Sequence, residues 1–212
     1  MSWVDEFFDD VYLDFMQYYR NEEISKTEAA FIQQSLGVRP GARFLDVACG
    51  HGRHMAHMPR DSVVGIDIKL EYLRHAKRFG DVVQADIRSM PFRKGAFQGA
   101  YIMHSTFGMF GDEMDMEILA WLSGVVKLGG LLLIDVANKD KVESVYASLG
   151  EMWNFWLTAG PYRMLSTAYY SPITSKVRET RLIYKNGRFQ RRGLFKKFRP
   201  SYYSRRQGRR RV

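Results

Sequence analysis

Short apolar runs recur through the middle of the chain, and segments with apolar residues at helical spacing lie between them. The runs that predict strands cover residues 43–48, 63–68, 81–86, 97–103 and 131–136. The segments between them predict a short helix that ends at Pro59, a helix over about 70–79 and another around 118–126. Strands that alternate with helices in this way are typical of a doubly wound, mostly parallel sheet, so we predict an α/β core.

Two further helices are predicted before this core. Aromatic residues lie three, four or seven positions apart in residues 4–20, which places one aromatic stripe along a helix. The stripe consists of Phe8, Tyr12, Phe15 and Tyr19. Residues 25–28, Ser-Lys-Thr-Glu, match a capping box, so a second helix is expected to begin there and to end near Gly37.

The pattern changes after about residue 158. Three strand-like segments predict an antiparallel excursion over residues 162–170, 176–184 and about 188–195. Asn186 and Gly187 separate the last two segments, and both residue types accept the positive φ values of a type I′ turn. Residues 171–175 are expected to form the other turn.

These elements divide the chain into four expected parts. They are a helical lid over residues 1–38, a core sheet over 39–140, a helix plus antiparallel excursion over 141–195 and a basic tail over 196–212. Eleven of the 32 Lys and Arg residues follow Gly187 with no acid among them, which leaves 21 basic against 23 acidic residues before that point. A basic tail of this kind can bind RNA or an anionic surface, although a solvated chain end is the simpler interpretation.

The remaining composition favours a cytoplasmic globular protein. Of the 212 residues, 46% are apolar, which is enough for a hydrophobic core. Cys49 is the single cysteine, so no internal disulfide is expected and the residue is interpreted as an apolar filler. The acidic N-terminus lacks the apolar segment of a signal peptide, and the longest apolar runs are too short to span a bilayer.

A glycine turn after the first predicted strand carries the main chemical signal. The pattern is Asp46-x-Ala48-x-Gly50-x-Gly52, and glycine there lets the backbone approach a nucleotide-like ligand closely. The next two strands also end in acids, Asp67 and Asp86. Because parallel strands end at the same edge of a sheet, we expect the three carboxylates to face one crevice. A dinucleotide fingerprint is not matched, since Met55 stands where its third glycine belongs.

The pattern around this turn resembles the signature of class I S-adenosylmethionine-dependent methyltransferases, with Ala48 in place of the usual first glycine. The resemblance continues in family order through residues 67–68, 85–92, 102–108 and 126–133. Together these segments cover about residues 40–137, and the set is far more specific than any one member. The N-terminal aromatic helix and the strand excursion resemble a branch of small, stand-alone bacterial and archaeal enzymes.

This resemblance implies a cofactor, S-adenosylmethionine, and methyl transfer to a small-molecule acceptor. By analogy with the family, the glycine turn and its acid would hold the methionine part, the second acid the ribose and the third the adenine. The implied cofactor-binding residues are Asp46, Ala48, Gly50, Gly52, Asp67, Ile68, Asp86, Ile87 and Met103. His104, which follows the fourth predicted strand, is a candidate general base, with simple packing as the alternative.

One feature departs from the family. A helix and two further strands usually complete a seven-stranded sheet, but no such pattern fits after residue 195. Either the sheet keeps five core strands, or a partner covers the exposed edge, or this end of the chain is not native to the family. Uncovered edges favour association, so a homodimer is one expectation.

The sequence is also compatible with other functions. The tail could bring RNA to the same pocket, or the protein could bind the cofactor without turnover. A nicotinamide-dependent oxidoreductase is disfavoured by the missing third glycine. His51, His54 and His57 recur every third residue, but side chains at that spacing fan out and lack partner ligands, so no metal site is expected.

Overall fold

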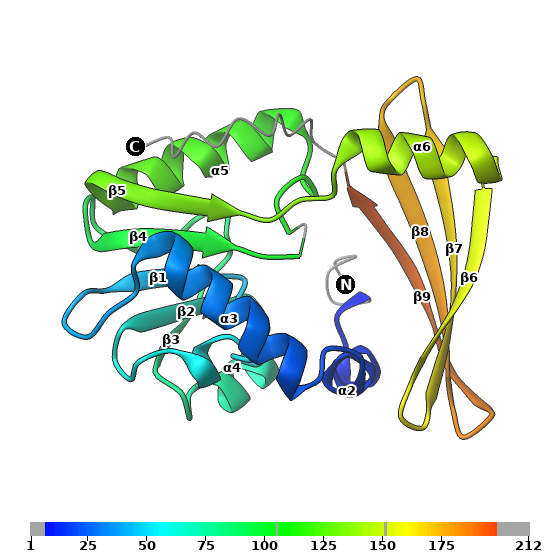
Figure 1. Ribbon diagram of the computed structural model, residues 1–212, viewed down its shortest axis with the longest axis horizontal. Coiled ribbons are helices and arrows are strands. Elements are labelled where there is room, and N and C mark those ends of the chain that lie inside the picture. The colour runs from blue at the N-terminus through cyan, green and yellow to red at the C-terminus, as the bar shows by residue number, and fades with distance from the viewer. Residues whose placement is uncertain (1–6, 105, 151, 199–212) are drawn as a thin grey trace. The chain divides into compact units, whose positions relative to one another are not determined.

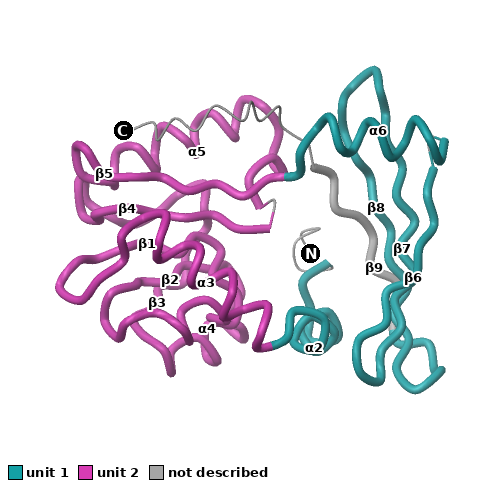
Figure 2. Tube along the Cα trace, viewed as in Figure 1, with its two compact units in different colours: residues 1–21, 137–203 teal, residues 22–136, 204–212 magenta. Residues whose placement is uncertain are grey.

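The computed structural model describes residues 7–104, 106–150 and 152–198. These residues form two compact units, shown in different colours in Figure 2. One unit comprises residues 22–136, and the other combines residues 7–21 with 137–198. Each unit is built around its own sheet, and all of the sequence-predicted site residues lie in residues 22–136.

The unit of residues 22–136 contains a five-stranded sheet in the order β3-β2-β1-β4-β5 (Figure 1). Its strands are β1 (Phe44–Val47), β2 (Val63–Asp67), β3 (Asp81–Gln84), β4 (Phe97–Ile102) and β5 (Val126–Ile134). Every neighbouring pair is parallel. This confirms the predicted doubly wound α/β core and places the ends of β1, β2 and β4 at one edge of the sheet.

Helices cover both faces of this sheet. They are α3 (Glu22–Leu36), the short 3-10 helix η1 (Met55–His57), α4 (Leu70–Ala76) and α5 (Asp112–Val125). Alternate strand residues point to opposite faces, so Phe44 packs with α3 and α4 while Leu45 packs with α5. The two resulting cores explain why the strands read as nearly continuous apolar runs.

Three sequence predictions for this unit were wrong in detail. The helix expected before Pro59 is only the single turn η1, because Gly52 still belongs to the preceding turn at φ +81°. Helix α3 begins at Glu22, three residues before the proposed capping box. Strand β5 begins at Val126 and runs through Gly130, where an added Cβ would meet the Gln98 carbonyl oxygen at 2.5 Å. That glycine therefore permits close strand pairing instead of marking the strand's start.

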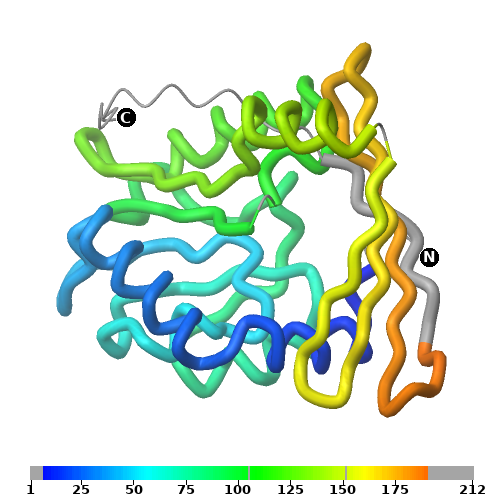
Figure 3. Tube along the Cα trace, turned by 45° about the vertical axis from the view of Figure 1, so that its right-hand side comes forward, coloured from blue at the N-terminus to red at the C-terminus, as the bar shows by residue number. Residues whose placement is uncertain are grey.

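The other unit contains an antiparallel sheet in the order β6-β7-β8-β9, seen from a second side in Figure 3. Its elements are α2 (Asp10–Tyr19), α6 (Lys139–Leu149), β6 (Met152–Ala159), β7 (Tyr162–Ser171), β8 (Lys176–Lys185) and β9 (Arg188–Phe198). The three predicted strands are confirmed, and β6 is a fourth that the sequence pattern did not reveal. Asn186 and Gly187 form the predicted tight turn, with φ values of 51° and 76°.

Helices α2 and α6 pack on one face of the antiparallel sheet. Phe15 of α2 is fully buried against Met164 and Ile183, and Tyr146 of α6 packs on Tyr170. These sheet residues lie at alternating positions and therefore share a face. Part of the predicted aromatic stripe thus forms a hydrophobic core within this unit.

Within the described part of the chain, no helix is long and apolar enough to cross a membrane. The end of the basic tail, residues 199–212, lies outside the described residues.

Candidate active site

The chain turns sharply where β1 ends, and the turn requires positive φ at three positions. Ala48 has φ 59°, Gly50 has φ 56° and Gly52 has φ 81°. Glycine adopts these angles freely, whereas an alanine there costs roughly 1–2 kcal/mol. Ala48, which replaces the family's usual first glycine, is therefore held in a strained conformation.

Gly50 and Gly52 serve the turn in different ways. A Cβ on Gly52 would lie 2.9 Å from the Cα of Ala76, so glycine there lets α4 approach the turn. A Cβ on Gly50 would meet no atom within 4 Å. Gly50 thus borders open space, where a ligand can contact the backbone directly.

Asp67, at the end of β2, fixes the shape of this turn. Its Oδ2 accepts a hydrogen bond from the Gly50 backbone N–H at 2.9 Å, and its Oδ1 accepts one from Lys69 N–H at 2.9 Å. Burial raises the pKa of Asp67 despite these bonds. Each carboxylate oxygen has a second lone pair, which remains suitable for a ligand hydroxyl.

Asp46 is buried with an unsatisfied oxygen. Its side-chain Oδ2 and the Tyr101 hydroxyl both find no hydrogen-bond partner among the described residues. Burial raises the pKa of Asp46 to about 7, although the nearby Tyr101 hydroxyl and the charge of Arg53 oppose the rise. Buried polar atoms without partners are uncommon in native proteins, so this carboxylate is suited to a cationic ligand group.

The remaining sequence-predicted residues have different surroundings. Asp86 is held by its neighbour Arg88, whose Nη2 lies 2.6 Å from Asp86 Oδ2, and this pairing lowers the pKa of Asp86. Ile68 is 40% exposed, whereas Ile87 is buried in the core between the sheet and α5. Met103 packs at the edge of the core on the other face. The structure thus joins Asp46 and Asp67 at the turn and pairs Asp86 with an arginine.

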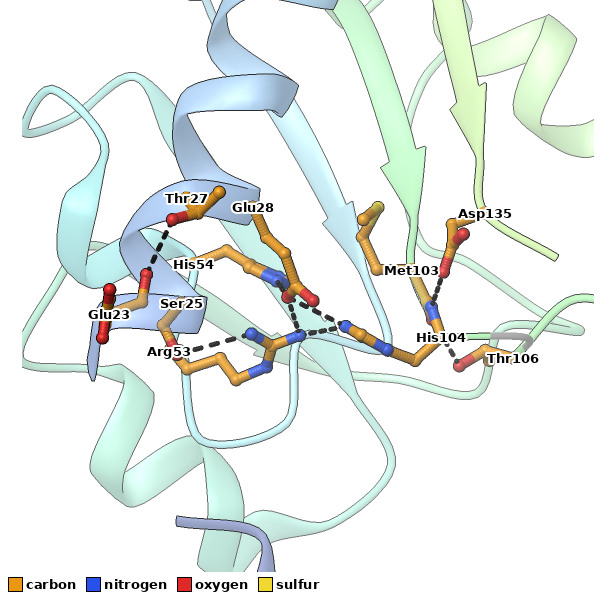
Figure 4. A network of polar contacts seen from close by, with 10 residues as sticks. All are labelled: Glu23, Ser25, Thr27, Glu28, Arg53, His54, Met103, His104, Thr106 and Asp135. Atoms are coloured by element: carbon orange, nitrogen blue, oxygen red, sulfur yellow. Dashed lines mark hydrogen bonds and ion pairs between the residues drawn. The ribbon is translucent and has the colours of Figure 1, made fainter. Parts of the chain in front are cut away.

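A polar cluster that the sequence did not predict lies beside the turn (Figure 4). Glu28 of α3 is its centre: Oε2 lies 2.5 Å from Arg53 Nη2, 3.1 Å from His54 Nε2 and 3.0 Å from His104 Nε2. Arg53 also contacts His104 Nε2 and reaches Ser25 Oγ at 3.4 Å. Ser25 and Glu28, the two proposed capping-box residues, therefore lie inside the helix, about one and two turns from its start, and bind Arg53 instead.

The charges of this cluster follow from its contacts. Partial burial would raise the pKa of Glu28, but hydrogen bonds from His104 and His54 and the charge of Arg53 outweigh it and hold the pKa far below its usual range. Burial lowers the pKa of His54 to about 4, which keeps this imidazole neutral near pH 7. The cluster is therefore built on an ionised carboxylate that faces one guanidinium and two imidazoles.

His104 is constrained at both its backbone and its side chain. It has φ 60°, an uncommon angle for a residue other than glycine, and its backbone N–H donates to Asp135 Oδ2 at 2.9 Å. Its ring stacks on His54 with centroids 5.9 Å apart and an interplanar angle of 7°. Asp135 lies just past β5, so elements from three parts of the sequence fix this one side chain.

Glutamate and histidine side chains are common metal ligands, so the cluster was compared with a metal site. In the described residues, the one set of side chains with suitably close ligand atoms is Glu28, His54 and His104. This set differs from the run of His51, His54 and His57 considered in the sequence. The Arg53 guanidinium already contacts Glu28 and His104, so it supplies the positive charge at the place where an ion would have to bind.

Comparisons with known proteins point to one family. A family model described as a methyltransferase domain matches residues 44–130. An uncharacterised protein of Methanocaldococcus jannaschii is 28% identical over 137 residues, which cover 64% of this chain and 52% of that protein. The chain therefore spans about half the length of this curated relative.

Two solved structures share the fold. The sugar N-methyltransferase KedS8 of Streptoalloteichus sp. gives a TM-score of 0.62 at 16% identity and covers 91% of this chain and 78% of its own. An S-adenosylmethionine-dependent methyltransferase of Clostridium acetobutylicum gives a TM-score of 0.66 at 15% identity, with 90% and 80% covered. Both similarities extend over the antiparallel unit as well as the parallel sheet, since they cover nine-tenths of this chain.

Proposed function

Because residues 44–130 match a methyltransferase domain and the chain shares the fold of S-adenosylmethionine-dependent methyltransferases, we propose that it is a class I member of this family and transfers a methyl group from S-adenosylmethionine to a small-molecule acceptor. The observation that carries the proposal is the unsatisfied Oδ2 of Asp46 next to the open backbone of Gly50. A buried carboxylate suits the ammonium of the cofactor's methionine part, and an unobstructed glycine suits close backbone approach.

The other proposed contacts extend from this point. Asp67 would accept hydrogen bonds from ribose hydroxyls while it continues to hold Gly50, and the exposed Ile68 would lie against the adenine. Asp86 would bind the adenine amino group only after releasing Arg88, with which it now pairs. Ala48, Gly52, Ile87 and Met103 would shape the site without polar side-chain contacts.

The bound cofactor supplies a sulfonium whose methyl group is already electrophilic. The protein's task is to hold the acceptor in line with the bond that breaks and to exclude competing water. Positioning of this kind supplies about 7–11 kcal/mol in the best intramolecular reactions. A methyltransferase of this class therefore needs few reacting side chains of its own.

A small-molecule acceptor is supported by KedS8, whose name describes a sugar N-methyltransferase with the same fold. The alternative of an RNA acceptor depended on the basic tail, and the end of that tail lies outside the described residues. In the described part of the candidate site, Arg53 pairs with Glu28 and Arg88 pairs with Asp86, so both of these cations already have acidic partners. The acceptor proposed here is therefore small.

Two measurements test this function. Calorimetry with S-adenosylhomocysteine should show one binding site per chain, whereas NAD should show none. A panel of small amines, amino sugars and hydroxy compounds, assayed by the release of S-adenosylhomocysteine from S-adenosylmethionine, should then contain at least one substrate. Binding of NAD alone would exclude the proposal, and cofactor binding with no turnover on a broad panel would favour a binding protein.

A further inference from the structure

We propose that Tyr101 is a positioning residue for cofactor binding: its hydroxyl donates a hydrogen bond to the Asp46 carboxylate and orients this carboxylate toward the ammonium of the methionine part. Asp46 would contact the ligand, whereas Tyr101 would act through Asp46. This inference rests on the proposed function and deepens it, because it adds a residue of β4 that no sequence pattern marked.

The sheet places Tyr101 directly beside Asp46. The two residues are register partners on the neighbouring parallel strands β1 and β4, so their side chains leave the same face of the sheet. Each stands one residue before the end of its strand. The two side chains are therefore neighbours at the edge of the sheet where the glycine turn begins.

Both side chains are buried, and each contains a polar atom without a hydrogen-bond partner in the described part of the chain. Asp46 is 2% exposed and Tyr101 is fully buried. The two atoms are Asp46 Oδ2 and the Tyr101 hydroxyl oxygen. Buried tyrosine hydroxyls usually have a partner, and buried atoms without one are rare. Two such atoms on adjacent strands indicate a shared role at one site.

The two groups are complementary as donor and acceptor. Burial and the negative charge of Asp46 raise the pKa of Tyr101 well above its usual value, so the phenol keeps its proton and can donate it. The terminal torsion of an aspartate is broad, so the carboxylate can rotate toward the hydroxyl without movement of either strand. Each carboxylate oxygen has two lone pairs, so Oδ2 can accept from Tyr101 and from a ligand ammonium together.

Charged groups of both signs act on Asp46. The Tyr101 hydroxyl and the charge of Arg53 favour its ionised form, whereas burial and the charge of Asp67 at the end of β2 raise its pKa. Arg53 is shared, because its Nη2 also pairs with Glu28 of α3. The hydroxyl of Tyr101 has no such second partner among the described residues. It is therefore available to Asp46.

Neutral side chains complete the surroundings of the pair. His54, whose ring lies edge-on to Tyr101 with centroids 6.3 Å apart, is uncharged near pH 7 because burial lowers its pKa to about 4. Burial also raises the pKa of the Cys49 thiol in the glycine turn, so the thiol keeps its proton. From α4, the apolar Leu73 packs in the same core. None of these three side chains adds a charge near neutral pH.

The effect of Tyr101 on the carboxylate can be measured without a ligand. Protein labelled with 13C at the aspartate carboxyl groups gives an NMR titration curve for Asp46, whose signal is assigned with the Asp46→Asn variant. We expect the pKa of Asp46, about 7 in the wild type, to lie about one pH unit higher in Tyr101→Phe, because the ionised form loses a hydrogen-bond donor. An unchanged titration in this variant would overturn the proposal.

Calorimetry with S-adenosylhomocysteine tests the consequence for binding. Wild-type affinity should increase as the pH rises through about 7, because only the ionised Asp46 attracts the ammonium. In Tyr101→Phe the same increase should occur about one pH unit higher, so its affinity should be about tenfold lower at about pH 6 and nearly equal at about pH 9. The ratio of the two affinities cancels the titration of the ligand itself. A ratio that does not change with pH would contradict the proposal.

Two controls isolate the hydroxyl of Tyr101. Tyr146→Phe, which removes the hydroxyl of a buried tyrosine on α6, should leave the pH profile unchanged. 5′-Methylthioadenosine contains the adenosine part but neither the ammonium nor the carboxylate of the cofactor. It should therefore bind Tyr101→Phe and the wild type within about twofold of each other. An equal loss of affinity for both ligands would show a general disturbance of the site and would refute the role of Tyr101.

The wild type separates the two levels of failure. If it does not bind S-adenosylhomocysteine, the proposed function fails. If it binds but its affinity is constant between about pH 6 and pH 8, Asp46 does not hold the ammonium and this inference falls. If the wild type titrates and Tyr101→Phe follows the same curve, only the role of Tyr101 is wrong. Phenylalanine keeps the buried ring and its packing, so the variant is expected to fold.

Discussion

At the scale of single residues, the buried carboxylate of Asp46 lowers the stability of the folded protein and favours the binding of a cationic ligand. Its Oδ2 has no partner among the described residues, and burial raises its pKa to about 7. A charge in that position is unfavourable for the folded protein until a cationic group arrives. The same cost gives the site a strong preference for a ligand ammonium, because binding supplies the missing partner.

This conflict predicts a pH-dependent gain in stability for Asp46→Asn. In the unfolded chain the carboxyl ionises near its ordinary pKa of 3.8, whereas in the folded protein its pKa is about 7. The folded state is therefore penalised as the pH rises from about 4 to about 7, and the penalty is complete above that range. Urea unfolding should show the Asp46→Asn variant more stable than the wild type by on the order of 2–4 kcal/mol at about pH 8 and little changed at about pH 4. Equal differences at both pH values would show that the pKa of Asp46 is not perturbed.

Replacement of Asp67 is expected to lower the affinity for S-adenosylhomocysteine. Asp67→Ala should weaken S-adenosylhomocysteine binding by about 1–3 kcal/mol in calorimetry, because it removes the partners of the ribose hydroxyls and frees the Gly50 N–H. Asp81→Asn is the control, since Asp81 is an exposed acid at the far end of the neighbouring strand and pairs only with Arg43 among the described residues. Unchanged affinity in Asp67→Ala would refute the ribose assignment.

At the scale of elements, the glycine turn predicts opposite behaviour for its two glycines. Gly52→Ala should destabilise the fold by about 2–4 kcal/mol, because it adds a clash with the backbone of α4 to the strain of a positive φ. Gly50→Ala meets no protein atom and should cost only about 1–2 kcal/mol of stability.

The affinity for S-adenosylhomocysteine distinguishes the two variants more clearly than their stability does. The methyl group in Gly50→Ala would point into the space proposed for the ligand, so its affinity for S-adenosylhomocysteine should fall by at least tenfold at temperatures where it is fully folded. Denaturant unfolding and calorimetry on the same samples measure both effects. A Gly50→Ala protein that binds normally would show that the cofactor does not lie against this turn.

The strands were predictable where one physical signal dominated. Val63 to Asp67 is flanked by helices on both faces, so its sequence is an apolar run that ends in an acid. Strand β6 was not recognised because its aromatic residues occupy both faces: Trp156 is 56% exposed, whereas the neighbouring Phe155 is partly buried against α6 and β7. Without alternation, such a segment carries no period-two signal.

The candidate site was predictable only where its residues are neighbours in sequence. The glycine turn and the strand-end acids have fixed spacings, which a sequence displays directly. Glu28 joins histidines that lie 26 and 76 positions away, and it matched a local capping pattern that the structure does not use. The helix begins three residues before this apparent cap, so Ser25 and Glu28 do not cap it. Tertiary contacts, and not the capping pattern, determine what these side chains bind.

At the scale of the whole molecule, the proposed cofactor contacts all come from residues 46–103, within the unit that contains the parallel sheet. None of the proposed contacts is assigned to residues 199–212. Deletion of residues 199–212 should therefore leave the affinity for S-adenosylhomocysteine unchanged within about twofold. Any salt-sensitive binding of RNA should disappear in the same variant, because that binding depends on clustered Lys and Arg. If the deletion abolished cofactor binding in a protein that remained folded, the site would have to include the tail, and the assignment of the cofactor to the glycine turn alone would fail.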